Sequence, residues 1–137
     1  MQTSVRGIQF IAQNEGFSPT VYNDAGHQAI GYGHDLLPGE SFHDGITEDQ
    51  ALDLLGKDVA RIDPYLNDMA PGLNQNQFDA LIDFGYNLGL GSLRTLLGHG
   101  IEQIPTQLAR WVDVQGKPYR VLIARRAAEV RLWLTPV

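Results

Sequence analysis

Turn and strand signals in this sequence are confined to one short segment near the N-terminus, and this limits the folds open to the chain. Between residues 17 and 34, Pro, Asn, Asp and Gly alternate with short β-forming runs, a pattern that predicts a small β-hairpin. From about residue 47 onward, apolar residues recur every three or four positions, as in amphipathic helices. The sequence therefore predicts an α+β architecture with a small β-hairpin lobe, a mainly helical lobe and a ligand groove between the two.

Helix-capping signals indicate where the helices begin and end. The first helix is predicted over about residues 3–15, with Gly16 as its C-terminal cap. Thr47 and Gln50 form a capping box that opens a second helix, which Pro64 is expected to end. Four further helices are predicted, over residues 75–88 with Asn74 as cap, 92–97 with Ser92 as cap, 105–111 with Pro105 in the first turn, and 121–134. We expect one domain over residues 1–137, with a β-hairpin lobe at about 17–46 and a helical lobe made of about 47–137 and the first helix.

Composition excludes several classes of function. The 137 residues include no cysteine, which removes disulfides, thiolate catalysis and zinc–thiolate sites, and the four histidines lack the spacing of known metal-ligand sets. No metal or other cofactor is therefore expected. The net charge of −6 argues against a nucleic-acid partner. No apolar run approaches the ~20 residues of a membrane span, and the N-terminus lacks the apolar core of a signal peptide.

Two carboxylates stand nine residues apart on different predicted elements. Glu15 ends the first helix, and Asp24 lies in the hairpin turn. Carboxylates on different elements can have different environments, so that one stays protonated as a general acid while the other, ionised, activates water or attacks a sugar. With sixteen acidic residues in the chain, the spacing alone more often marks two solvated surface acids.

Several motifs follow one another along the chain in a set order. Around the two acids they are Glu15-Gly16-Phe17, Tyr22-Asn23-Asp24-Ala25-Gly26 and Ile30-Gly31-Tyr32-Gly33-His34, and further on they lie at residues 73–81, 84–89, 110–112, 116–117 and 122–129. Together they extend from about residue 8 to residue 134, and in this order they resemble the phage-type lysozymes, glycoside hydrolase family 24. The resemblance implies a lysozyme-like fold with the active-site groove between the lobes. It also implies a muramidase that cleaves the β-1,4 bond between N-acetylmuramic acid and N-acetylglucosamine in peptidoglycan.

The resemblance further implies roles for individual residues. Glu15 would be the general acid that protonates the glycosidic oxygen, and Asp24 the carboxylate that assists attack by water on the anomeric carbon with inversion. Inverting enzymes hold the two carboxyl groups ~6.5–9.5 Å apart, with room for a water. Arg125 and Arg126 match the paired arginines of the family, one of which is expected to orient Glu15 through an ion pair. That ion pair would lower the pKa of Glu15, so burial must outweigh it if the acid is to stay protonated.

Other residues match positions expected to contact the sugar. They are Tyr32, Tyr86, Asn87 and Lys117. Tyr86 offers a flat ring and a hydroxyl, and Asn87 offers a donor and an acceptor to an acetamido group. A purely structural place in the core is the alternative for Tyr86. His34 follows a glycine-flanked tyrosine and is expected to make a structural hydrogen bond beside the acid.

Two departures from the family pattern affect the part of the mechanism that positions water. Ala29 stands where the family has a threonine, and its methyl group cannot hydrogen-bond a water. The segment between Asp24 and Ala29 is also one residue shorter, so another placement of the gap would put Asn23 in the second catalytic position. We prefer Asp24, because its spacing from Glu15 is kept and the amide of an asparagine has no basic site. Two polar residues of the turn, His27 and Gln28, either position the water in place of the threonine or only stabilise the backbone of the turn.

Three functions stay open at this point. The first is the hydrolytic muramidase. The second is a lytic transglycosylase, which needs chiefly the Glu because the 6-hydroxyl of the sugar attacks instead of water and leaves a 1,6-anhydromuramic end. The third is a cell-wall-binding module that has lost catalysis through the change at Ala29. In each case the expected partner is a peptidoglycan glycan strand, and the chain is expected to be a monomer. With no signal peptide, such a protein would be made in the host cytoplasm and reach the cell wall through a holin-type pore.

Overall fold

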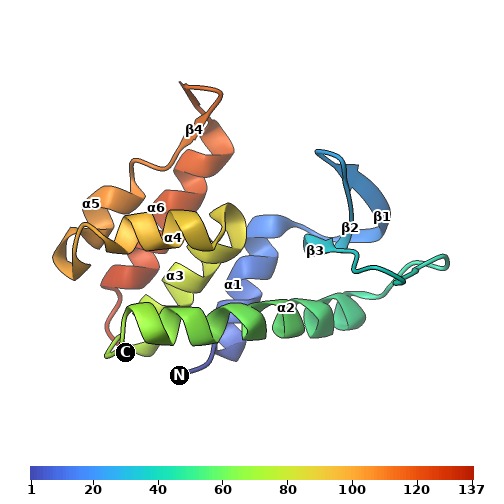
Figure 1. Ribbon diagram of the computed structural model, residues 1–137, viewed down its shortest axis with the longest axis horizontal. Helices are drawn as coiled ribbons and strands as arrows, with labels where there is room; N and C mark the ends of the chain where they lie inside the picture. The colour runs from blue at the N-terminus through green and yellow to red at the C-terminus, as the bar shows by residue number, and fades with distance from the viewer.

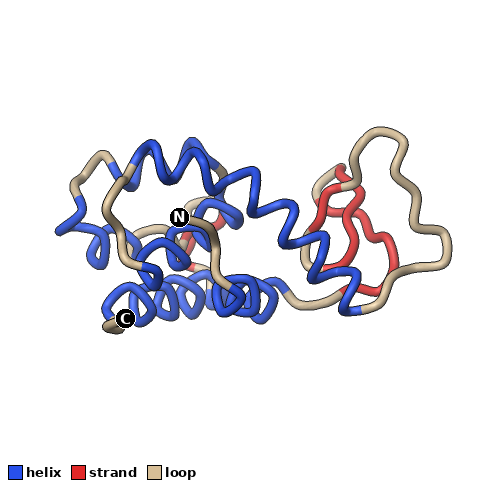
Figure 2. Tube along the Cα trace, turned by 90° about the horizontal axis from the view of Figure 1, so that it is seen from below, coloured by secondary structure: helices blue, strands red, loops and turns tan.

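Two lobes, one of strands and one of helices, make up the computed structural model, which describes residues 1–137 (Figure 1). In chain order the elements are α1 (Val5–Glu15), β1 (Ser18–Asp24), β2 (His27–Gly31), β3 (His34–Asp35), α2 (Glu48–Met69), α3 (Gln75–Leu88), α4 (Leu90–Leu97), the 3-10 helix η1 (Ile101–Gln103), α5 (Ile104–Leu108), β4 (Asp113–Val114), β5 (Lys117–Pro118) and α6 (Arg120–Leu134). The antiparallel sheet β1-β2-β3 lies to one side of the helices, and α2 extends from the helical lobe to the sheet (Figure 2). The predicted α+β fold class is confirmed.

The second helix is longer than the sequence predicts. Its capping box is present, since Thr47 Oγ1 accepts a hydrogen bond from the Gln50 backbone N–H and the Gln50 side chain accepts one from the Thr47 backbone N–H. The prediction that Pro64 ends the helix is wrong, because the helix continues through Pro64 to Met69. A proline in a helix interior costs about 3 kcal/mol. Leu66, beyond the proline, is fully buried in the core, and its burial offsets much of that cost.

Other boundaries also differ from the prediction. α4 begins directly after Gly89, so Ser92 lies inside this helix and does not cap it. α5 ends at Leu108, before the predicted end at residue 111. The short strands β3, β4 and β5 have only two residues each, and strands of that length show no period in a sequence. The helices at 5–15, 75–88 and 120–134 agree with the prediction to within two residues.

The central helix α3 holds α1 in place, and thereby the residue at the end of α1. Residues 78–85 of α3 are all buried, and α3 packs against α1, α2, α4 and α6. The Asp79 carboxylate accepts from the backbone N–H and the hydroxyl of Ser4, and Asp63 on α2 accepts from the same two groups of Thr3. The start of α1 is thus anchored to two helices, so Glu15 at its other end has a well-defined position.

The register of the sheet decides which side chains share a face. Residues paired directly across two strands have their side chains on the same face. The pairs on one face are Tyr22 with Ala29, Asp24 with His27, and Ala29 with Asp35, and we name it the Tyr22 face. Asn23 and Gln28 pair with each other and lie on the opposite face, because side chains alternate along a strand.

A turn of two residues, Ala25 and Gly26, joins β1 to β2 and accounts for the short segment before Ala29. Both turn residues have positive φ, 50° and 89°, as a type I′ turn requires. This conformation costs an alanine about 1–2 kcal/mol, whereas asparagine adopts it more readily. We expect Ala25→Asn to raise the free energy of unfolding by about 0.5–1 kcal/mol, measured by urea denaturation.

The matched control for this prediction is the same substitution at Ala127, which is exposed in α6. Asparagine has a lower helix propensity than alanine, so Ala127→Asn should lower the free energy of unfolding by about 0.5 kcal/mol. A loss of stability at Ala25 as large as the loss at Ala127 would contradict the strain assigned to the turn.

Candidate active site

Glu15 stands where the helical lobe meets the sheet. It is the last residue of α1, and Gly16, with a φ of 75°, turns the chain toward β1. The Glu15 side chain is 21% exposed. A surface hollow of about 380 Å³ opens at this point, and its lining residues are Glu15, Gly16, Phe17, Ser18 and Tyr22. This hollow is the candidate ligand site.

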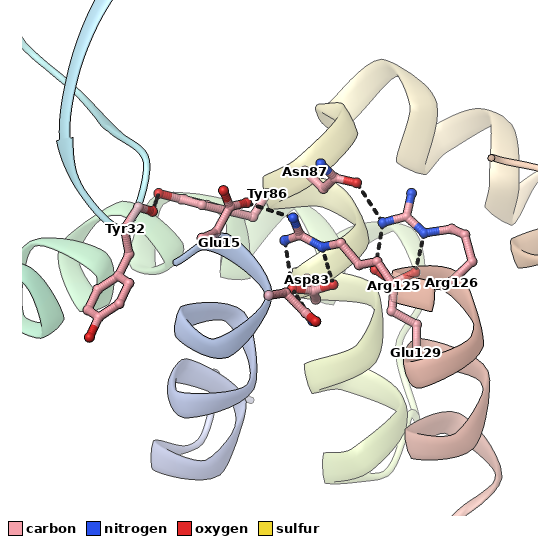
Figure 3. A network of polar contacts seen from close by, with 9 residues as sticks. Glu15, Tyr32, Asp83, Tyr86, Asn87, Arg125, Arg126 and Glu129 are labelled. Atoms are coloured by element: carbon pink, nitrogen blue, oxygen red, sulfur yellow. Dashed lines mark hydrogen bonds and ion pairs between the residues drawn. The ribbon is translucent and has the colours of Figure 1, made fainter. Parts of the chain in front are cut away.

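Arg125 on α6 holds the Glu15 carboxylate in position. Its Nη1 lies 2.9 Å from Glu15 Oε1. Its Nε and Nη2 donate to the two carboxylate oxygens of Asp83, at 3.0 and 2.8 Å. Asp83 lies on α3 and is fully buried, so side chains from three helices form one line of charges (Figure 3). Because two bonds to Asp83 fix the plane of the guanidinium, the N–H that reaches Glu15 has a fixed direction.

The surroundings of Glu15 favour its protonated form. Burial is the largest influence and raises the pKa of Glu15, while the adjacent Arg125 lowers it through charge and hydrogen bonding. The negative charges of Asp83 and Asp24 raise the pKa further. The net shift is upward from the ordinary value of 4.5, so burial outweighs the ion pair. Glu15 therefore keeps its proton to a higher pH than an exposed glutamate does.

The turn between β2 and β3 passes close to Glu15. A Cβ at Gly33, where φ is 81°, would lie 3.2 Å from Glu15 Oε2 and 3.4 Å from Tyr86 Oη. Any other residue at this position would strain the backbone and crowd the acid. The Tyr86 hydroxyl donates to the Tyr32 carbonyl at 2.7 Å, which ties α3 to the turn. Burial raises the pKa of Tyr86 far above its ordinary value of 10, so this hydroxyl stays protonated at neutral pH.

The Tyr32 side chain does not face the site. Its ring points away from Glu15, as Figure 3 shows, and packs against Phe17 with ring centroids 5.6 Å apart. The residue is buried in the core. The Tyr32 ring packs among apolar side chains, and its backbone carbonyl accepts the hydrogen bond from Tyr86, so the sugar contact of the Tyr32 side chain stays a prediction.

Arg126 belongs to a second buried network and does not pair with Glu15. Its Nη2 donates to Asn87 Oδ1 at 2.6 Å and to Glu129 Oε2 at 2.9 Å, and its Nε lies 2.8 Å from Glu129 Oε1. Arg126 and Glu129 are 1% and 0% exposed. Of the two arginines, Arg125 alone contacts the acid. Arg126 instead fixes the amide of Asn87, and the NH2 group of that amide remains free for a ligand.

The Tyr22 face of the sheet is the face turned toward Glu15, because Tyr22 lines the hollow beside the acid. Asp24 shares this face and is exposed, and its carboxylate makes no hydrogen bond or ion pair with the rest of the chain. Asn23 lies on the opposite face. Of the two residues that sequence alignment leaves open for the second catalytic position, Asp24 is the one on the side of Glu15.

The two candidates for replacing the family threonine lie on different faces. His27 is the direct partner of Asp24 and shares the Tyr22 face. Gln28 lines a separate hollow on the opposite face, together with Leu36. Ala29 itself is fully buried. Gln28 is thus directed away from Glu15, which does not support a role in holding the attacking water.

His34 makes structural hydrogen bonds to two carboxylates, neither of which is that of Glu15. Its Nδ1 lies 2.7 Å from Asp58 Oδ2 on α2, and its Nε2 lies 2.9 Å from Glu40 Oε1 in the loop that follows β3. Burial by itself lowers the pKa of His34, but the two carboxylates raise it above its ordinary value. The bonds therefore join the sheet to α2 and to the loop.

Lys117 is exposed on β5, in a hairpin of the helical lobe, and takes part in no ion pair. Its sugar contact stays a prediction. Sequence reasoning does not identify Asp83, although a signal is present. Asp83 stands between Ile82 and Phe84 in a fully buried stretch of helix, and a carboxylate in such a place requires a cationic partner.

The arrangement can support acid–base chemistry on a ligand in the hollow. A half-buried carboxyl whose pKa is raised can donate a proton, and an exposed carboxylate on the facing sheet can accept one. No three His, Asp or Glu side chains come close enough together to hold a metal ion. None of the helices combines the length and the apolar character of a membrane span.

Comparison with known proteins bears on the same residues. The family model described as phage lysozyme matches residues 12–129, a stretch that includes both Glu15 and Asp24. The chain belongs to the phage lysozyme family. This family of glycoside hydrolases includes the endolysin of Bacillus phage PZA, which is 37% identical to this chain over 97% of the chain. The chain spans 55% of the length of that endolysin. The endolysin of Acyrthosiphon pisum secondary endosymbiont phage 1 is 31% identical over 97% of this chain and 98% of its own length.

Solved structures of this family share the fold. The muramidase domain of SpmX from Asticaccaulis excentricus superposes with a TM-score of 0.85 at 31% identity, over 98% of this chain and 99% of that one. A P22 lysozyme mutant superposes with a TM-score of 0.80 at 27% identity, over 98% and 99% of the two chains. The lysozyme-like fold implied by the order of the motifs is thereby confirmed.

Proposed function

We infer that this phage lysozyme family member is a muramidase that hydrolyses the β-1,4 bond between N-acetylmuramic acid and N-acetylglucosamine in peptidoglycan. The observation that carries the inference is the environment of the Glu15 carboxyl group. Burial favours the protonated form of this acid, Arg125 directs it, and it lies in a hollow toward which the face with Asp24 is turned. Relatives named endolysins and a structural neighbour described as a muramidase domain support the same reaction.

In the proposed reaction the two carboxyl groups have complementary roles. A water attacks C1 of the muramic acid residue from the side of Asp24, which accepts a proton from the water. The bond between C1 and the glycosidic oxygen breaks, its electron pair goes to that oxygen, and Glu15 gives the oxygen its proton. Attack opposite the leaving group inverts the configuration at C1. The Tyr86 hydroxyl and the free NH2 group of Asn87 are the candidate contacts that align the sugar.

A lytic transglycosylase is the second candidate function, and the observation that favours it is the buried methyl group at Ala29. Without a hydroxyl at this position, one means of holding a water is missing. In a transglycosylase the 6-hydroxyl of the muramic acid attacks C1, so no water is needed. The exposed and unpaired Asp24 carboxylate supports hydrolysis instead, because it can activate a water.

Analysis of the products separates these functions. Purified peptidoglycan digested by the chain should yield muropeptides with reducing N-acetylmuramic ends, which borohydride reduces and mass spectrometry detects. Anhydro products, lighter by one water and resistant to borohydride, would replace the proposed hydrolysis by the transglycosylase reaction. Tight binding to the glycan with no new ends of either kind would support the binding module and contradict both enzymes.

The proposed place of action is the cell wall, with glycan strands as the partner. The release route through a holin-type pore stays a prediction. One relative, the SAR-endolysin of Bacteriophage PS119, is 36% identical over 87% of this chain and 77% of its own length. Its name indicates a different route for that protein, so the family alone does not decide the route for this chain.

A further inference from the structure

The position where this chain lacks the family threonine has a carboxylate as its direct neighbour. Ala29 on β2 pairs with Asp35 on β3, and both belong to the Tyr22 face. Paired residues on one face have Cβ atoms about 4.5–5.5 Å apart. The Ala29 methyl group is fully buried, so neighbouring side chains cover it. Asp35 is its direct cross-strand partner, and the aspartate side chain is longer than a threonine hydroxyl by one bond, so an Asp35 oxygen can reach the place where a hydroxyl on residue 29 would stand.

We propose that Asp35 is a catalytic residue that holds the attacking water in place of a hydroxyl at position 29. This inference rests on the proposed hydrolysis and adds to it a residue that the family motifs do not include. Asp35 accepts a hydrogen bond from one hydrogen of the water, while the other proton passes to Asp24 as C1 is attacked. No bond to Asp35 forms or breaks, and the proton balance of the reaction is unchanged.

The chain geometry places Asp35 close to the acid. Gly33 is the residue whose added Cβ would lie 3.2 Å from Glu15 Oε2, and Asp35 follows it by two residues. Two residues of extended chain span at most about 7 Å. The Asp35 backbone therefore lies within that distance of the point where the turn meets Glu15, and its side chain shares the face turned toward the hollow.

The surroundings of Asp35 leave its carboxylate available. The residue is exposed and makes no hydrogen bond or ion pair with the rest of the chain. The charge of Asp35 acts on Tyr22, which lines the hollow. Burial raises the pKa of the Tyr22 hydroxyl, and the carboxylates of Asp24, Glu15 and Asp35 raise it further. An exposed carboxylate beside the ligand site is a strong hydrogen-bond acceptor for water.

The register favours Asp35 over His27, the other polar neighbour of Ala29 on the Tyr22 face. Asp35 is at the level of Ala29, directly across the strand pair. His27 is two residues further along β2 toward the hairpin end, about 7 Å from the level of Ala29 and level with Asp24. His27 therefore serves as the comparison residue in the test.

The test measures kcat and KM on purified glycan strands for Asp35→Asn, with His27→Gln and Asp44→Asn as controls. Asp44 is exposed and lines a different hollow. We expect Asp35→Asn to lower kcat at least about tenfold with KM within about twofold of wild type, because a water ligand acts in the transition state. Both controls should retain wild-type kcat.

A second pair of variants separates water binding from a merely structural role. Asp35→Ala should lose activity as Asp35→Asn does, and adding Ala29→Thr to it should restore part of kcat, because the hydroxyl then holds the water. The proposal is overturned if Asp35→Asn keeps kcat within about twofold of wild type, or if His27→Gln loses as much. It is also overturned if adding Ala29→Thr to Asp35→Ala restores none of the lost kcat. A wild-type chain that releases no reducing ends would instead reject the proposed hydrolysis itself.

Discussion

Replacement of Glu15 by glutamine is expected to lower the rate of glycan cleavage by at least about 100-fold. Glutamine has the same size and still accepts a hydrogen bond from Arg125, but it has no proton to give to the leaving oxygen. The measurement is the release of reducing ends from purified peptidoglycan. Glu102→Gln is the matched control, since Glu102 is exposed in η1, and this variant should keep wild-type activity.

Loss of folding cannot account for the expected result. Because the pKa of Glu15 is raised on folding, ionised Glu15 disfavours the folded state as pH rises through that pKa. Glutamine cannot ionise, so Glu15→Gln should unfold at the same or a higher temperature than wild type at neutral pH. A variant that is folded and retains activity within about tenfold of wild type would remove Glu15 as the general acid.

The raised pKa of Glu15 also determines the pH dependence of the wild-type enzyme. The general acid must be protonated, so kcat should fall on the alkaline side as pH rises through the pKa of Glu15 in the complex. The midpoint of that limb should lie above 4.5, the ordinary value for a glutamate. A limb centred at or below the ordinary value would show that Arg125 outweighs burial.

Glu129→Ala is expected to lower the free energy of unfolding by about 3–5 kcal/mol, the largest effect on stability that we predict. Glu129 and Arg126 are almost completely buried and pair at 2.8 Å. Removal of the carboxylate leaves the Arg126 guanidinium buried without its main partner, and it also leaves a cavity. Urea denaturation at neutral pH measures the change.

Removal of both charges provides the control for this prediction. The double variant Arg126→Met with Glu129→Leu places apolar groups of similar volume in the same space, so it should be less destabilised than Glu129→Ala alone. Arg131→Ala, at an exposed site of the same helix, should change stability by no more than about 0.5 kcal/mol. If the double variant is the least stable of the three, the buried pair is not the source of the effect.

The helices with strong local signals are the parts of the fold that sequence predicts best. The capping box predicted at Thr47 and the cap predicted at Asn74 operate within four residues, and both are present. Pro64 is a local signal too, but the burial of Leu66 beyond it overrides the local preference. A contact between residues distant in sequence decides that boundary, so the local pattern cannot predict it.

The candidate site divides in the same way. The motifs around Glu15 and Asp24 are local, and they place an acid at a helix end and a second acid on the neighbouring hairpin. The ion-pair partner of Glu15 is not fixed by local sequence, because two adjacent arginines in α6 match the motif equally well. Which arginine contacts Glu15 depends on the rotation of α6 against α3, where Asp83 accepts two hydrogen bonds from Arg125.

By itself, the sequence determined the fold class, the family resemblance and the two candidate acids, because capping, periodicity and ordered motifs are properties of short segments. The tertiary structure alone decided which groups surround those acids. Packing buries Glu15 enough to raise its pKa against the pull of Arg125, turns the Tyr32 ring into the core, and sets the cross-strand register that brings Asp35 beside Ala29. Burial and register arise from contacts between distant segments, and no local pattern contains them.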